Sequence, residues 1–129
     1  MKKTGRTRPS TPSYISARRL DAAEFMRAAR QLDNDDYQPD VVVTLAVHAA
    51  IAAADVICSV RLGKHSADGN HDAAVALLRE HDAKLASDLD TVLRRKQRAG
   101  YSDNDLTDAD TTAVLRSTER LLEAAQNTH

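Results

Sequence analysis

The stretch PDVVVTLAVHAAIAAADVICSVRL, residues 39–62, decides the fold. Its apolar residues surround the helical wheel almost completely, which is typical of a helix that is packed on all sides. Pro39 suits a first helical turn, Asp40 suits the positive end of the helix dipole, and Gly63 suits the position just past the last turn. We therefore expect a helix over residues 39–62 at the centre of a bundle.

The same stretch is the longest apolar run in the chain, and a membrane is the first alternative. A membrane span would leave His48 and Asp55 in hydrocarbon, which is energetically expensive. The N-terminus, MKKTGRTRPS, is basic and has no apolar run behind it, so it does not read as a secretory signal. We expect a soluble, cytoplasmic protein that does not contact a membrane.

Composition agrees with a helical fold. The chain has 129 residues and a net charge of −1, enough for one domain that folds without a disulfide or a metal. The single Cys58 excludes a disulfide framework and a multi-cysteine zinc site. Aromatic residues make up 3% of the chain, which argues against a base-stacking platform. Four glycines and three prolines, with many alanines and leucines, favour helices over a β-sandwich.

The remaining pattern predicts an all-α bundle of four to five helices in residues 14–127, behind a disordered basic tail over residues 1–13. The tail either keeps the chain soluble or contacts a nucleic acid or an acidic partner. Ser16 is the expected cap of the first helix, and Thr107 with Asp110 forms an expected capping box for the last. No strand is expected. The predicted helices cover residues 15–32, 39–62, a segment from 70 or 71, 84–100 and a segment after 107.

The most informative polar feature lies on the central helix. Thr44, His48, Asp55 and Ser59 fall within about 40° of one line at about 100° per residue. A buried histidine or aspartate needs hydrogen-bond partners, and we expect these to come from other helices. The line is either a structural polar seam, inside the bundle or between two copies, or a functional pocket.

A second feature is the basic end of the fourth helix. Arg94, Arg95 and Arg98 are either a solvated end that complements the helix dipole or contacts for a nucleic-acid phosphate. Lys96 falls instead on the apolar stripe of this helix, where a lysine needs a carboxylate or must reach out to solvent. Asp55, the one acid inside the apolar helix, is the expected partner of Lys96.

Other chemistries lack the residues they need. His65 and His71 bracket a loop, but no spaced histidine or cysteine pair accompanies them, so we expect no metal and no other cofactor. No glycine-flanked nucleophile turn and no phosphate-binding glycine loop occurs.

The order of elements resembles the small HEPN-domain proteins of prokaryotes. The resemblance covers roughly residues 15–126 and rests on V-H-A-A-I-A-A-A-D-V-I-C in the central helix, N-H-D-A-A-V-A-L-L after the loop, and L-R-R-K-Q-R-A-G-Y before the last helix. It implies a helical bundle, often a homodimer, in toxin–antitoxin and antiphage defence systems. It further implies a nucleotidyltransferase-like or toxin/antitoxin partner protein.

Active members of that family cleave RNA with an arginine, a following polar residue and a histidine four to six positions after the arginine. The nearest match here is Lys96 in the arginine position, Gln97 in the polar position and Tyr101 where the histidine belongs. Tyrosine, with a pKa near 10, is a poor general base at neutral pH. The resemblance therefore implies a degenerate motif, although His48 or His71 remains a conceivable substitute.

Three functions remain, in order of expectation. The first is a HEPN-like module that binds a protein partner, RNA or both without cleavage. The second is a structural helical adaptor, a dimerisation module that does not contact nucleic acid. The third is an active metal-independent RNase that uses non-standard residues. We expect a homodimer, because the central helix is apolar over more of its circumference than one small bundle usually covers.

Overall fold

A computed structural model describes residues 5–101 and 106–129 of the chain, with side chains for residues 5–97 and 106–129. Within these residues the fold is a helical bundle with one small two-stranded antiparallel sheet. The elements, in chain order, are β1 (Thr7–Pro9), α1 (Pro12–Asn34), α2 (Pro39–Leu62), β2 (Lys64–Ser66), α3 (His71–Arg79), α4 (Ala83–Tyr101) and α5 (Asp108–Gln126).

Helix α2 lies at the centre of the bundle, as the sequence predicts. It begins at Pro39 and ends at Leu62, and Gly63 closes it in the left-handed conformation with a φ of 76°. The helix packs against α1, α3, α4, α5 and β2. Its inner side consists of alanine, valine and isoleucine side chains with almost no exposed surface, among them Ala46, Ala53 and Ile57. Small side chains let the neighbouring helices approach closely, which explains how one chain encloses so apolar a helix.

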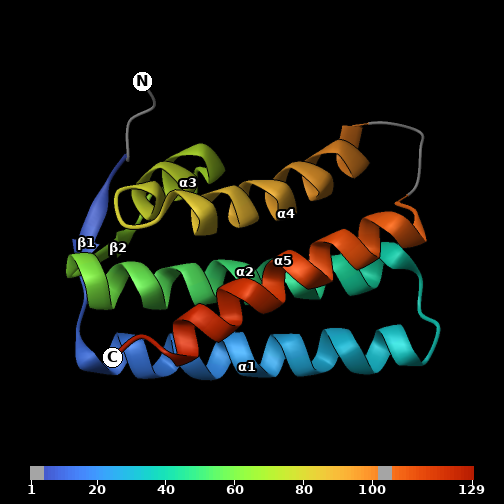
Figure 1. The fold of residues 1–129 in the computed structure, drawn as a ribbon, viewed down its shortest axis with the longest axis horizontal. Coiled ribbons are helices and arrows are strands. Elements are labelled where there is room, and N and C mark those ends of the chain that lie inside the picture. Colours follow the sequence, from blue (N-terminus) through green and yellow to red (C-terminus); the bar gives the residue numbers. More distant parts are fainter. Residues whose placement is uncertain (1–4, 102–105) are drawn as a thin grey trace.

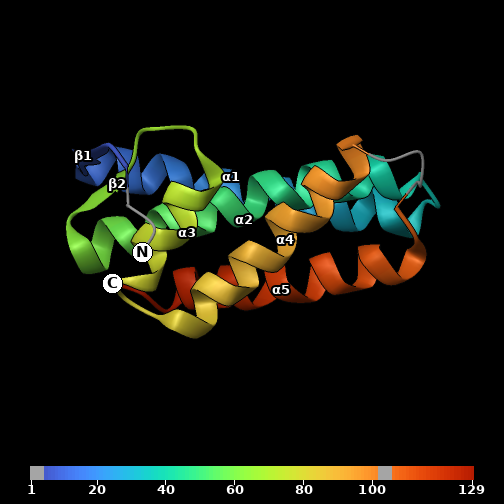
Figure 2. The ribbon, with the colours of Figure 1, turned by 90° about the horizontal axis from the view of Figure 1, so that it is seen from above.

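The helices form stacked layers with α2 in the middle (Figure 1). Helix α1 runs antiparallel to α2 on one side, while α3 and α4 lie on the other, and α5 crosses α2 obliquely between them. Both β-strands, the start of α1 and the end of α2 gather at one end of the bundle (Figures 1 and 2). The turn between α1 and α2 lies at the opposite end.

Local capping signals are confirmed at α3 and α5. The side chain of Asn70 accepts a hydrogen bond from the backbone N–H of Ala73 and starts α3. Thr107 and Asp110 form the predicted reciprocal capping box at the start of α5. Residues 80–82 interrupt the helical structure between α3 and α4. The carboxylate of Asp82 accepts a hydrogen bond from the backbone N–H of Leu85. The caps of α3 and α5 depend on residues close in sequence, which is why sequence reasoning finds these two helix starts. The Asp82 cap was not predicted.

The prediction of a disordered tail over residues 1–13 is wrong for the part that the structure describes. Strand β1 pairs with β2 in antiparallel register, with Thr7 opposite Ser66, and no sequence periodicity marks so short a strand. Helix α1 then begins at Pro12, with Thr11 rather than Ser16 as its cap. Residues 1–4 lie outside the described residues. The strand forms because its backbone bonds are completed by a segment more than fifty residues away.

Helix α2 is long and apolar enough to cross a membrane by length and composition, and 67% of its most apolar window is buried inside the bundle. That burial is consistent with the core helix of a soluble protein, because the surrounding helices supply the apolar environment.

Candidate functional site

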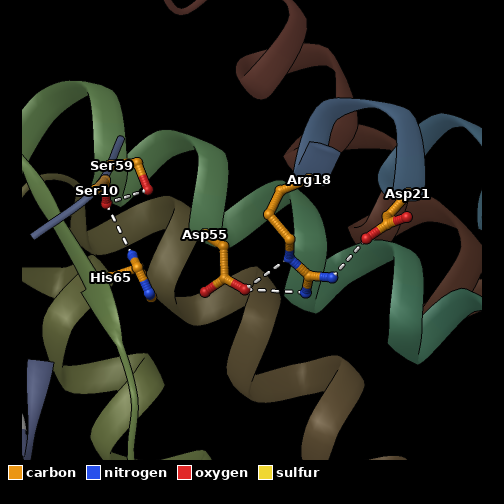
Figure 3. Close-up of polar contacts among 6 residues, drawn as sticks. All are labelled: Ser10, Arg18, Asp21, Asp55, Ser59 and His65. Atoms are coloured by element: carbon orange, nitrogen blue, oxygen red, sulfur yellow. Dashed lines mark hydrogen bonds and ion pairs between the residues drawn. The ribbon is translucent and has the colours of Figure 1, made fainter. Parts of the chain in front are cut away.

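The densest polar cluster lies where the β-strands meet the ends of α1 and α2. We call it the strap cluster, because it ties the strap formed by residues 5–11 to the bundle. Its members are Ser10, Tyr14, Arg18, Asp21, Asp55, Ser59 and His65. Figure 3 shows two separate groups of polar contacts within the cluster, one centred on Ser10 and one centred on Arg18.

Arg18 and Asp55 form the ionic half of the cluster (Figure 3). Arg18 Nε and Nη2 donate to the same oxygen, Oδ2 of Asp55, at 3.1 and 2.9 Å. Arg18 Nη1 donates to Asp21 Oδ2 at 3.0 Å. Burial raises the pKa of the Asp55 carboxyl, and the guanidinium beside it opposes that rise. The predicted pair between Lys96 and Asp55 is therefore wrong, because Arg18 from α1 already holds this carboxylate.

The neutral half of the cluster is built on His65. The ring of Tyr14 stacks on the ring of His65, with centroids 3.7 Å apart and an interplanar angle of 15°. Ser10 Oγ lies 2.9 Å from His65 Nδ1 and donates to Ser59 Oγ at 2.7 Å. Burial, together with the Asp55 carboxylate, raises the pKa of Tyr14 to about 12. Burial also lowers the pKa of His65, against the opposing pull of Asp55.

The side chains of the strap cluster connect the strap, α1, α2 and β2 to one another. Their protonation states at neutral pH do not suit acid–base or nucleophilic chemistry. At neutral pH the depressed pKa keeps the His65 imidazole uncharged, and Tyr14 stays protonated. Burial raises the pKa of the neighbouring Cys58 thiol to about 12, so it is no nucleophile. The hollow beside Asp55, which Cys58 and Ser66 also line, has a volume of about 10 Å³. That space is too small for a substrate.

The predicted polar line on α2 divides into two unlike parts. Asp55 and Ser59, toward the end of the helix, belong to the strap cluster. Thr44 is half-buried and donates its hydroxyl to the backbone oxygen of Asp40 at 2.7 Å. His48 is exposed and stacks on Phe25 of α1 with ring centroids 5.1 Å apart, so its predicted burial is wrong. Helical spacing places the four side chains on one line, but the neighbouring helices decide which of them are covered.

Two arginines at the basic end of α4, Arg94 and Arg95, are paired within the chain. Arg94 Nε donates to Asp90 Oδ2 at 2.7 Å, one turn back on the same helix. Arg95 Nη1 donates at 2.5 Å to Asp110 Oδ1 in the capping box of α5. The two carboxylates offset the positive charges of Arg94 and Arg95, which would otherwise be available to bind a nucleic-acid phosphate.

The degenerate motif lies partly outside what the structure describes. Lys96 is half-buried on α4, and Gln97 next to it is exposed. The side chains of Arg98 and Tyr101 fall outside the described residues. Among the described residues, no group of three or more histidine, cysteine or carboxylate side chains is arranged to hold a metal ion.

Sequence reasoning missed the α1 half of the strap cluster. Tyr14, Arg18 and Asp21 lie four and three positions apart, which puts them on one face of a helix. That polar face was the available signal, and it interrupts the apolar stripe of α1. Ser10 carried no such signal, because its partners His65 and Ser59 lie about fifty residues away in sequence.

Comparison with protein-family models, with curated proteins and with solved structures found no match to this chain.

Proposed function

We propose that this protein is a HEPN-like helical-bundle module that binds a protein partner and does not cleave RNA. The observation that carries the proposal is the state of the basic end of α4. Arg94 and Arg95 are held by Asp90 and Asp110, so two of the three arginines expected to meet RNA phosphates are already paired within the chain. The resemblance supplies the setting, a toxin–antitoxin or antiphage defence system in the cytoplasm, with a nucleotidyltransferase-like or toxin/antitoxin protein as partner.

The absence of a histidine at position 101 supports a non-cleaving role. Moving the proton of a 2′-hydroxyl requires a group with a pKa near neutrality, and a tyrosine is poorly suited to this. The histidines considered as substitutes belong to other elements. His48 stacks on Phe25 of α1, and His71 is the first residue of α3. Neither histidine is on α4 with Lys96 and Tyr101.

A homodimer remains part of the proposal, and it rests on the family resemblance rather than on the apolar circumference of α2. The second half of α2 is covered by helices of the same chain, so it does not need a second copy. Light scattering at micromolar concentration tests the point, since a dimer has twice the 14.1 kDa mass of the chain. A dimer that binds neither RNA nor a second protein would favour the structural adaptor instead.

The test of the proposal is an RNA assay with the purified full chain. Labelled single-stranded RNA is incubated with the protein in EDTA, and both cleavage and retention at physiological salt are measured. We expect neither. Metal-independent cleavage that Tyr101→Phe abolishes would overturn the proposal and favour the active RNase.

Two further measurements sharpen the result. The double change Lys96→Arg with Tyr101→His restores the residue types of active family members. New RNA cleavage by this variant would show that these two substitutions alone account for the missing activity. Co-expression with the proteins encoded beside this chain tests the binding role. Stable co-elution with one of them supports the proposal, and co-elution with none of them contradicts it.

A further inference from the structure

Exposed large apolar side chains concentrate at the turn between α1 and α2. In the part of the chain that the structure describes, Leu20, Tyr37 and Val41 are 62%, 53% and 40% exposed. Tyr37 and Val41 lie four residues apart, while Leu20 stands alone on α1. Single exposed apolar residues are ordinary, but neighbouring ones mark contact surfaces.

This surface continues along the first half of α2. Val41, Thr44, Leu45 and His48 lie within about 100° of one another around the helix. Val41 and His48 are exposed, and Thr44 and Leu45 are half-buried. We call these four residues, with Tyr37 in the turn that precedes the helix, the open face of α2. Side chains four apart, such as Val41 and Leu45, form the kind of ridge that fits a groove on another helix.

The open face has a strongly acidic border. Asp33, Asp35, Asp36 and Asp40 are all exposed around Tyr37. Between residues 31 and 47 the chain has no lysine or arginine. The nearest arginine in the sequence, Arg30, is paired with Glu119 of α5. The side-chain charges of residues 31–47 are therefore all negative, although the whole chain is almost neutral.

Charge complementarity selects between occupants. A second copy that met this border with its own would bring like charges together, which is unfavourable. A partner with lysine or arginine beside an apolar stripe would satisfy both the acids and the exposed apolar surface.

We propose that the open face of α2 docks a basic amphipathic helix of another protein. Apolar side chains of that helix cover Tyr37, Val41 and Leu45, and its basic side chains meet the carboxylates of Asp35, Asp36 and Asp40. The proposal rests on the proposed function in one respect, since it says which surface of the binding module receives the partner.

A pair of designed peptides tests this. The probe is a helical peptide of leucine and lysine at heptad spacing, and its control replaces every lysine with glutamate. Each is titrated into the full chain, with backbone amide shifts and calorimetry as readouts. We expect the lysine peptide to bind and to shift amides of residues 35–48, and the glutamate peptide not to bind.

Matched variants separate the open face from general charge attraction. Val41→Ser and Tyr37→Ser should each weaken binding about tenfold, because each removes a buried apolar contact of about 1.4 kcal/mol. The pair Asp35→Asn with Asp36→Asn should weaken it by a similar factor, and asparagine tolerates the positive φ of 60° at position 36. Leu20→Ser, an equally polar change at a more exposed residue, should leave the affinity unchanged.

Several results would overturn the proposal. These are equal binding of both peptides, shifts centred on Leu20, or an affinity that Val41→Ser leaves unchanged. A dimer that Val41→Ser converts to monomer would give the open face to a second copy and would also overturn it. A failure of the proposed function gives a different result. If the chain cleaves RNA and Val41→Ser does not change that cleavage, the proposed function fails, but the docking proposal is not affected.

Discussion

The two halves of α2 have similar sequences and different surroundings. From Ala49 to Ser59 nearly every side chain is buried under α1, α5, α3 and α4. From Val41 to His48 the same helix alternates between buried residues and an open face. Both halves supply core residues, but only the first half also leaves apolar surface in solution. The comparison shows that an all-round apolar helix is not evidence for complete burial.

The largest expected effect concerns the buried half. Ile57→Asp should unfold the protein, since an unpaired carboxylate at a side chain with 0% exposure costs several kcal/mol. Val41→Asp, the matched change on the open face, should leave the fold intact. Circular dichroism and urea unfolding measure both. A folded, fully helical Ile57→Asp protein would contradict the placement of α2.

The next effect concerns the ion pair that the sequence assigned to another residue. Arg18→Met should cost about 2–3 kcal/mol of unfolding free energy, because it leaves the Asp55 carboxylate in a poorly solvated place. Asp55→Asn should cost a similar amount, and the two changes together should cost less than their sum.

Lys96→Met provides the control for that cycle. Its effect should add to that of Asp55→Asn, because Arg18 occupies the carboxylate. If the losses of unfolding free energy were non-additive for Lys96 and Asp55 but additive for Arg18 and Asp55, the predicted pair between Lys96 and Asp55 would be correct after all.

A smaller, stabilising effect is expected on the covered side of the bundle. Thr118 of α5 is 0% exposed, and its hydroxyl has no hydrogen-bond partner among the described residues. Thr118→Val keeps the shape and removes the unsatisfied group, so it should stabilise the fold by about 1 kcal/mol. Thr44→Val on the open face should gain nothing, because it removes the bond to the Asp40 carbonyl. Thermal unfolding compares the two variants.

The smallest effect is a pH dependence at the strap cluster. Burial lowers the pKa of His65, so below its ordinary value of 6.5 the unfolded chain binds the proton more readily than the folded one. Stability from this residue is therefore complete above about pH 6.5 and falls as the pH drops toward the lowered value. His65→Gln should flatten the stability curve between pH 7 and pH 5. An unchanged slope would mean that another group titrates there.

The candidate site was predictable only where its parts are local. The line of Thr44, His48, Asp55 and Ser59 follows from helical spacing, and the structure keeps Asp55 and Ser59 in one cluster. The partner of Asp55 could not be predicted from the sequence, because Lys96 and Arg18 both carry the positive charge that this carboxylate requires. The choice between them depends on how α1 and α4 sit against α2, which periodicity does not report.

By itself the sequence determined approximately where the helices lie along the chain, how α2 begins and ends, and how α5 begins. Pro39 and Gly63 bound α2, and Thr107 with Asp110 starts α5, because these signals act between neighbours along the chain. Only the tertiary structure decided that residues 7–9 form a strand, that Arg18 holds Asp55, and that the first half of α2 stays open. Each of these depends on segments far apart in sequence, and their contacts form only once the helices have packed.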